Sequence, residues 1–412
     1  MAKRNTFILN AALTLTIAVS VYYAMNDTTQ STYTGVTRAR AFEGRSQRSG
    51  EPSASFAIGQ LAGITKAVTR YADGQLLSNC IKGNYSIVNR NCTGSDGNGY
   101  ISLQAASDAS AAGDTILIRS FSGVYTGSAG YSGIVPKSGT SPSVRTTYSG
   151  YLTERPRVGP IGNGSTPASY VYIKNLIVDM QNTFDSYMGG ISYSRLENLE
   201  IKNGGVHGIL GIGSSELINL DVHDNGSNNS LCIPATPNYQ CHGVYTGPGS
   251  ASDPLGNFNT FDGGRYYNNG AGYGIHCYSH CAGTTIRNLR VDHNGWTGVI
   301  MLSDSGNQIY NVVADNNGGL GIWITSDGMV ASNITAYNNS AGEIYVSDSN
   351  NQTVKNTIAI PSGITAVPGT ILSNNITSGS ASSYFVDAAN GNFQLLPTSP
   401  AGIGASLPMV YN

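Results

Sequence analysis

An asparagine returns at a regular interval along most of this chain. It stands each time in a short phrase, an apolar run followed by a polar turn, as in LINLDVHDNG and IRNLRVDHNG. Successive copies lie 21 to 23 residues apart, except for one step of 69, which the copy FDGGRYYNNG divides into 44 and 25. The repeated residues are Asn175, Asn198, Asn219, Asn288, Asn311, Asn333 and Asn356, with Gly263 in the divided step. No copy can bury its apolar residues alone, so the copies are predicted to stack as the coils of a solenoid.

A glycine begins a second short apolar strand in each coil. These glycines are Gly208, Gly243, Gly274, Gly298, Gly321 and Gly342. The residues one and three positions after the glycine are mostly apolar, so they are predicted to point inward. The alternate residues would then form an outward column, about 4.8 Å apart from coil to coil: Leu210, Tyr245, His276, Ile300, Trp323 and Ile344. The opposite orientation stays open, because Ile300 and Ile344 are apolar as well.

The composition excludes one large class of function. Only 11% of the residues are charged, and 22 Lys and Arg nearly balance 24 Asp and Glu. No basic stripe is present, so nucleic-acid binding is not expected.

The N-terminus has the pattern of a secretory signal. The basic pair Lys3-Arg4 precedes an apolar run from Phe7 to Val19, which is short for a membrane span. Residues 1–25 are therefore predicted to be a signal peptide or an uncleaved signal anchor, which would be the only membrane contact. Residues 26–91 are predicted to be a partly disordered leader. The body is expected to be secreted or displayed at the cell surface.

Six cysteines fall into three close pairs, as expected in an oxidising compartment. The predicted bridges are Cys80–Cys92, Cys232–Cys241 and Cys277–Cys281. An alternative is a metal site in the segment HCYSHC, formed by His276, Cys277, His280 and Cys281.

Several phrases resemble the right-handed parallel β-helix proteins of the pectate-lyase-like superfamily. They are SLQAASDASAAGDTILI, the repeated HGV, YGIH, TGVIM and LGIWI units, and the closing GNFQLLPTSPAGIG. The resemblance covers residues 92–408 and implies an all-β solenoid. A helix over Ile101–Ala112 would cap its N-terminal end. The superfamily includes polyuronate lyases, uronan epimerases, glycosidases, tailspikes and adhesins, so the resemblance favours an extended polysaccharide as the partner.

Two insertions flank one strand. Most coils need three to five residues from the polar turn to the next glycine, but 18 separate Asn225 from Gly243, and extra residues follow from Pro248 to Gly256. Inserted loops on a regular solenoid commonly carry function. The binding cleft is therefore predicted around Gly243.

Histidines gather in the same region. All six fall between His207 and His293, and His207, His242 and His276 are predicted to share one side. In a uronate β-elimination, His242 or His276 would take the C5 proton and Tyr245 would protonate the leaving oxygen. The substrate-binding candidates beside them are His207, Tyr278 and Trp323. The alternative is that these histidines only bind turn backbone.

A charged column is predicted on the other strand of the coils. Asp221, Arg265 and Arg290 stack there, with His223 nearby. Either arginine would neutralise a uronate carboxylate, with Asp221 and His223 as binding residues. The alternative is a set of surface ion pairs.

No cofactor is expected, although calcium is not excluded. The sequence contains no EF-hand, no nonapeptide calcium repeat and no obvious dense acidic cluster. That departs from many pectate lyases and argues against calcium-dependent chemistry.

The preferred hypothesis is a secreted enzyme that cleaves an acidic polysaccharide by β-elimination. One alternative is a non-catalytic glycan-binding or adhesin-type β-helix. Others are a uronan epimerase and a glycoside hydrolase, which would need two spaced carboxylates. The candidates for those carboxylates are Glu216, Asp221, Asp224, Asp253 and Asp262.

Overall fold

The computed structural model describes most of the chain after residue 66. The described residues are 67–127, 133–162, 167–227, 232, 241–247, 256–278, 280–302, 305–347 and 351–407. The predicted signal segment and much of the predicted leader lie outside them, as do most of the two insertions around Gly243. Within the described ranges, no helix is long and apolar enough to cross a membrane.

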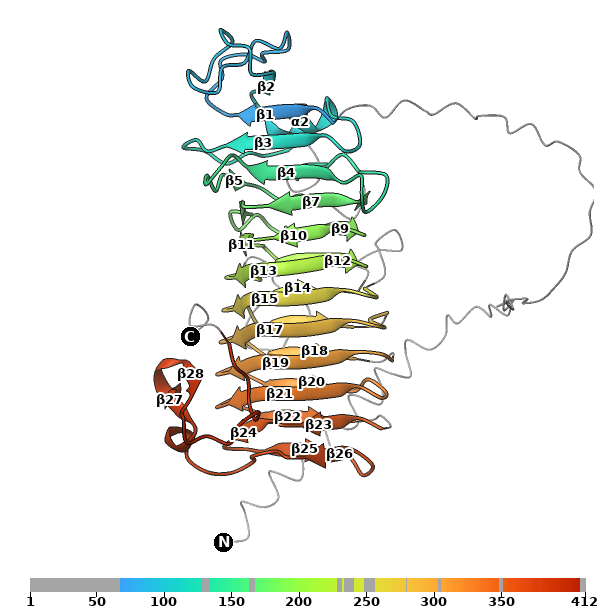
Figure 1. Ribbon diagram of the computed structural model, residues 1–412, viewed down its shortest axis with the longest axis vertical. Coiled ribbons are helices and arrows are strands. Elements are labelled where there is room, and N and C mark those ends of the chain that lie inside the picture. Colours follow the sequence, from blue (N-terminus) through green and yellow to red (C-terminus); the bar gives the residue numbers. More distant parts are fainter. Residues whose placement is uncertain are drawn as a thin grey trace, which may run out of the picture. The chain divides into compact units, whose positions relative to one another are not determined.

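The described chain winds into a parallel β-helix (Figure 1). The larger sheet contains β1 (Thr69–Asp73), β2 (Asn98–Tyr100), β3 (Thr115–Arg119), β4 (Thr146–Gly150), β5 (Arg157–Val158), β7 (Val171–Lys174), β8 (Ile177–Asp179), β10 (Arg195–Glu197), β11 (Glu200–Lys202), β13 (Glu216–His223), β15 (Thr260–Tyr267), β17 (Thr285–Asp292), β19 (Gln308–Asp315), β21 (Val330–Tyr337), β23 (Thr353–Lys355), β24 (Ile358–Ile360) and β26 (Ile371–Ser373). The smaller sheet contains β6 (Ala168–Ser169), β9 (Met188–Ser192), β12 (Ile209–Gly213), β14 (Val244–Tyr245), β16 (Ile275–Cys277), β18 (Val299–Met301), β20 (Leu320–Ile324), β22 (Gly342–Val346) and β25 (Ile364–Ala366). Each strand pairs in parallel with the strands of neighbouring coils, which confirms the predicted fold.

The repeated asparagines bend the larger sheet. Each adopts a left-handed backbone, with φ of 51° at Asn219 and 54° at Asn311, which asparagine tolerates better than most residues. Their side chains form a ladder on the outside, where Nδ2 of Asn311 donates to Oδ1 of Asn288 over 2.8 Å. The prediction that these residues occupy equivalent turns is confirmed. These asparagines are not buried in the core, because the bend turns each amide outward.

A second asparagine ladder, which the sequence analysis missed, is the buried one. It links five turn residues through their side chains: Asn225, Asn269, Asn294, Asn317 and Asn339. Nδ2 of Asn317 donates to Oδ1 of Asn339 (2.9 Å) and to the carbonyl oxygen of Val291 (3.0 Å), while its Oδ1 accepts from the backbone N–H of Asn294 (3.1 Å). The ladder ends where Asn339 donates to the carboxylate of Glu343 over 2.7 Å. The repeated turns DNG, NNG and HNG were its sequence signal.

The buried ladder explains five of the six strand glycines, from Gly208 to Gly321. A Cβ at Gly298 would lie 2.8 Å from Nδ2 of Asn317 and 2.6 Å from the carbonyl oxygen of Gly321. No larger residue fits between the ladder and the next coil.

The core runs through the solenoid, and the predicted inward orientation is confirmed for five coils. Ile209, Val244, Ile275, Val299 and Ile322 are fully buried in one cluster. The coil of β22 differs, because β22 pairs Ile344 with inward Ile322 and places Tyr345 opposite Trp323. Ile344 is therefore a core residue, and Tyr345 takes its predicted place in the outward column.

The solenoid begins earlier than residue 92, the predicted boundary. β1 pairs along its length with β3, from Thr69↔Thr115 to Asp73↔Arg119, so part of the predicted leader belongs to the sheet. The predicted helix is present but shorter, as α2 (Leu103–Asp108). It is capped by Ser102 and buries Leu103 and Ala106 in the core.

The C-terminal segment packs against the outside of the larger sheet. It contains η3 (Ala381–Ser383), β27 (Phe385–Asp387), η4 (Ala388–Asn390) and β28 (Asn392–Leu395), and β27 and β28 form an antiparallel hairpin. Phe385 and Phe393 are buried with Val313 of β19 and Ile358 of β24. This hairpin covers part of the face on which the charged column was predicted.

Replacing Asn317 with alanine should destabilise the protein by about 1–3 kcal/mol, because it leaves buried backbone groups without partners. Asn198→Gly is the control, since Asn198 is exposed and glycine tolerates its positive φ. Urea denaturation should show a much smaller loss for the control. Equal losses would contradict a special role for the buried ladder.

Candidate functional site

The structure brings the predicted histidines together with tyrosines on the smaller sheet. We call this group the His–Tyr cluster, and its members are His207, His242, Tyr245, Tyr273, His276 and Tyr278. The ring centroids of His207 and His242 are 5.1 Å apart, and those of His242 and His276 are 4.6 Å apart. Tyr245 and Tyr278 lie 5.0 and 5.4 Å from His276. Sequence reasoning missed Tyr273, which lies 4.5 Å from His276.

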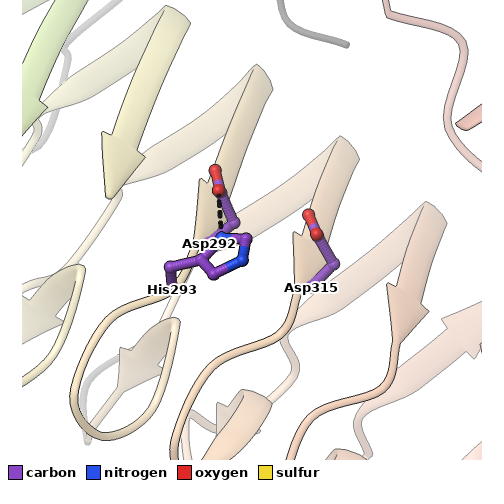
Figure 2. Close-up of side chains that lie close together, drawn as sticks. All are labelled: Asp292, His293 and Asp315. Atoms are coloured by element: carbon purple, nitrogen blue, oxygen red, sulfur yellow. Dashed lines mark hydrogen bonds and ion pairs between the residues drawn. The ribbon is translucent and has the colours of Figure 1, made fainter. Parts of the chain in front are cut away.

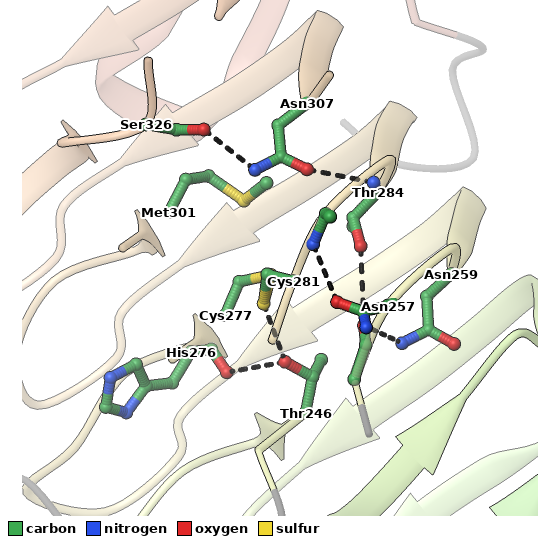
Figure 3. Close-up of a disulfide and its surroundings, with 12 residues drawn as sticks. Thr246, Asn257, Asn259, His276, Cys277, Cys281, Thr284, Met301, Asn307 and Ser326 are labelled. Carbon is green, nitrogen blue, oxygen red and sulfur yellow. Dashed lines mark hydrogen bonds between the residues drawn. A yellow bond between two sulfur atoms is a disulfide. The ribbon is translucent and has the colours of Figure 1, made fainter. Parts of the chain in front are cut away.

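Strand alternation sets the direction of each side chain. On β16, Ile275 and Cys277 point into the core, so His276 between them points outward. Figure 3 shows the His276 ring directed away from the Cys277–Cys281 disulfide. Below that bridge, the hydroxyl of Thr246 lies 3.1 Å from Sγ of Cys281. The core residues and the disulfide on the inner side of β16 therefore fix the position of the strand, and His276 lies on its outer side.

All three predicted disulfides are present: Cys80–Cys92, Cys232–Cys241 and Cys277–Cys281. The Cys277 and Cys281 sulfurs are bonded to each other, so neither is a thiolate. That removes two of the four ligands of the alternative metal site, which is therefore not supported.

The three histidines of the cluster are almost fully buried. His207 is 7% exposed, His242 1% and His276 6%. Loss of water disfavours the imidazolium, and burial lowers the pKa of His207 and of His276 to about 3. Both rings are therefore neutral near neutral pH.

Hydrogen bonds decide which ring nitrogens remain available. Nδ1 of His242 accepts from the backbone N–H of Tyr273 (3.1 Å), and its Nε2 lies 3.0 Å from Nδ1 of His276. Both nitrogens of His242 are thus engaged, which argues against the predicted role of His242 as the base. Nε2 of His276 is buried and has no hydrogen-bond partner among the described residues.

The outward column extends the cluster towards the C-terminus. Register places Tyr245, His276, Ile300, Trp323 and Tyr345 in line across five coils. The Trp323 side chain is half-buried, and its indole N–H donates to Oγ of Ser347 over 2.9 Å. An extended chain laid on this face would meet Tyr245 and Trp323 three coils apart.

The charged column belongs to the larger sheet instead. Asp221, Arg265 and Arg290 are register partners on β13, β15 and β17, as predicted. A groove of about 670 Å³ is lined there by Arg155, Asp221, Arg265 and Tyr267, among others. Loss of water in the groove raises the pKa of Asp221, although part of its side chain reaches solvent. The predicted site residues thus form two groups, on different sheets.

Both arginines of the column already have carboxylate partners. Arg265 donates to both oxygens of Asp292, over 2.8 and 2.6 Å, and lies over the ring of Tyr267. Arg290 donates to both oxygens of Asp315, each over 2.9 Å, and to the carbonyl oxygen of Gly391 over 3.1 Å. Arg290 is only 3% exposed, which argues against its predicted contact with substrate.

The remaining predicted residues of this column also have neighbours. Nδ1 of His223 lies 2.7 Å from the carboxylate of Asp224, and the His223 ring stacks on Tyr267 at 4.8 Å. Two other carboxylates considered for hydrolysis pair with arginines: Glu216 with Arg145 and Arg195, and Asp262 with Arg287. Asp253 lies outside the described residues.

Asp292, His293 and Asp315 are close enough to suggest a cation site (Figure 2). Asp292 accepts from Arg265 and from Nδ1 of His293 over 2.7 Å, and Asp315 accepts from Arg290. Two guanidinium groups therefore already neutralise these carboxylates and would repel a cation. The group is an ion-pair network rather than a metal centre.

Comparison with known proteins supports the fold. The family model described as "Right handed beta helix region" matches residues 273–395. The structure is similar to pectate lyase Pel9A, with a TM-score of 0.58 and 18% identity over 82% of this chain and 91% of that one. It is also similar to a rhamnogalacturonan lyase, with a TM-score of 0.50 and 16% identity over 84% and 97% of the two chains. Curated protein sequences gave no match. The chain is a right-handed parallel β-helix protein with the pectate-lyase-like fold.

The buried histidines predict a loss of stability in acid. His207 has a lower pKa folded than unfolded, so the unfolded state binds more protons as the pH falls below about 6.5. The free energy of unfolding should fall by about 1.4 kcal/mol per pH unit for this group, down to a pH of about 3. His207→Asn keeps an acceptor for the N–H of His242 but cannot titrate. In urea denaturation at pH 7 and 4.5, the variant should lose less stability than the wild type. Parallel losses would contradict the neutral buried state.

Replacing Arg290 with methionine should destabilise the protein by about 3–5 kcal/mol, because it leaves Asp315 buried without its cation. Arg287→Met is the matched control, since Arg287 pairs with Asp262 at 2.7 Å but is 37% exposed, and such pairs contribute about 0–1 kcal/mol. Thermal denaturation measures both. A small effect of Arg290→Met would contradict the importance of this buried pair.

Proposed function

We propose that this protein is a secreted enzyme that acts on an extended acidic polysaccharide, and that its reaction is uronate β-elimination. The site is the outward face of the smaller sheet at the His–Tyr cluster. One observation carries the proposal: His276 has a buried ring nitrogen without a described partner, next to the half-buried rings of Tyr245 and Tyr278. Polar atoms of this kind cluster at functional sites.

The fold supports a long, repetitive substrate. A parallel β-helix offers one flat face along many coils, and an extended glycan presents repeating units to such a face. Two structures that share this fold are a pectate lyase and a rhamnogalacturonan lyase. The three disulfides fit an oxidising compartment and therefore support secretion.

In this proposal, tyrosines bind the sugar ring and transfer the proton. The apolar face of a sugar ring can stack on Tyr245 and Tyr278, and Trp323 offers a further contact along the same column. A phenol hydroxyl can accept or donate a proton. Tyr245 is therefore assigned both transfers: its oxygen takes the C5 proton and its hydroxyl proton goes to the leaving oxygen as the C–O bond breaks, so that Tyr245 ends in its starting state. His276 contacts the acidic group, in place of the base role first given to it.

A non-catalytic glycan-binding protein is the second candidate. In the part of the chain that the structure describes, no arginine, lysine or carboxylate contributes to the pKa shifts of His207 and His276. A site without strong acids and bases suits binding as well as turnover. The two candidates differ in whether the glycan is cleaved.

Turnover is tested with polygalacturonate and alginate, with and without added calcium, by the absorbance of unsaturated uronates. Tyr245→Phe should lower kcat by about 10²–10⁴-fold, because it removes the transferred proton. Its melting temperature should not change, since the ring remains. Trp323→Phe is the control and should weaken binding modestly without loss of turnover.

Binding without cleavage on every glycan would favour the non-catalytic candidate. Full activity of Tyr245→Phe would contradict this site and favour the groove lined by Asp221 and Arg265 as the active site. Activity that depends strictly on calcium would contradict the expectation from the sequence that no cofactor is needed.

A further inference from the structure

Backbone amides fix the direction of the hydrogen bonds among the three buried histidines. The N–H of His242 donates to Nδ1 of His207, and the N–H of Tyr273 donates to Nδ1 of His242, each over 3.1 Å. An amide N–H can only donate. Nδ1 is therefore an acceptor, without a proton, in both His207 and His242.

The remaining proton positions follow from this step. A neutral imidazole carries one proton, so that of His242 is on Nε2. This nitrogen lies 3.0 Å from Nδ1 of His276, so His242 donates and His276 accepts. The single proton of His276 is then on its own Nε2.

The series of hydrogen bonds thus ends at the Nε2–H donor of His276. Nε2 of His276 is fully buried and has no acceptor among the described residues. It lies among the rings of Tyr245, Tyr273 and Tyr278. A buried N–H without an acceptor is unfavourable, so the site is completed by an oxygen from outside.

We infer that His276 is a fixed N–H donor for a ligand oxyanion, the carboxylate of an acidic sugar, and that His207 and His242 hold it in this tautomer. A neutral donor in a dry site binds a carboxylate through a charge-assisted hydrogen bond. It also stabilises the further negative charge that develops when the neighbouring carbon loses its proton. His276 thus supplies the neutralisation first assigned to Arg265 or Arg290. The identity of the ligand rests on the proposed function, whereas the tautomers do not.

The tautomers are tested by NMR of the full-length protein labelled with ¹⁵N-histidine. The couplings between ring nitrogens and ring carbon protons should show Nε2–H, with unprotonated Nδ1, for His207, His242 and His276 at pH 7 and unchanged at pH 5. An Nδ1–H tautomer of His242 or His276, or an imidazolium at pH 5, would overturn the inference.

The ligand is tested with two probes, sodium acetate and trigalacturonate. Each should move the Nε2 and Hε2 resonances of His276, while a neutral galactose trimer should not. A response to acetate alone would uphold the donor and remove the proposed substrate. No response to either anion would overturn the inference.

Two substitutions separate a donor from a base. Glutamine at position 276 offers a carboxamide N–H near the place of Nε2, whereas leucine offers none. His276→Gln should keep trigalacturonate affinity within roughly threefold, and His276→Leu should lose roughly tenfold or more, as expected for an unpaired buried anion. Turnover of His276→Gln should fall less than that of His276→Leu, because glutamine still donates an N–H. A base role for His276 predicts equal losses instead, since neither glutamine nor leucine can act as a base. Equal loss in both variants, with melting temperatures unchanged, would contradict the donor role.

Discussion

The hydrogen bonds of the buried asparagine ladder are the interaction on which the rest of the solenoid depends. A coil must turn sharply between its strands, and each turn leaves backbone groups that no strand can pair. The amides of Asn225 to Asn339 satisfy these groups and link each coil to the next. The same contacts require glycine at the start of the neighbouring strand, as at Gly298. One polar requirement thereby sets the turn, the strand start and the spacing of coils.

The His–Tyr cluster uses the same device on the outer face. Nδ1 of His207 and of His242 accepts a backbone N–H from the following coil, whereas Oδ1 in the ladder accepts one from the preceding coil. An imidazole differs from an amide in one respect. When one ring nitrogen accepts a hydrogen bond, the single proton of the neutral ring lies on the other nitrogen, which then donates to the next group. The series of histidine hydrogen bonds ends at His276, whereas the asparagine ladder ends at Glu343. The same type of hydrogen bond between coils therefore stabilises turns in the asparagine ladder and orients the N–H donor of His276 in the His–Tyr cluster.

Sequence reasoning recovered the fold because the repeat is visible in the residues themselves. The coils, the inward residues from Ile209 to Ile322 and the three disulfides all followed from spacing and pattern. The inward place of Ile344 did not, because the register shifts by one residue at β22. Nor did the burial of Arg290, which depends on a hairpin about 100 residues away in sequence. The gathering of histidines was visible, but proton positions depend on which backbone N–H faces which ring nitrogen.

The disulfides have a mechanical consequence. Each joins cysteines only 12, 9 or 4 residues apart, which is less than one repeat. No covalent bond among these three therefore ties one coil to another. Apart from the continuous backbone, neighbouring coils are joined by hydrogen bonds, ion pairs and buried side chains. Under tension along its axis, such a molecule would extend in steps as single coils peel away. The bridges would shorten the length released at each step without raising the force at which a step begins.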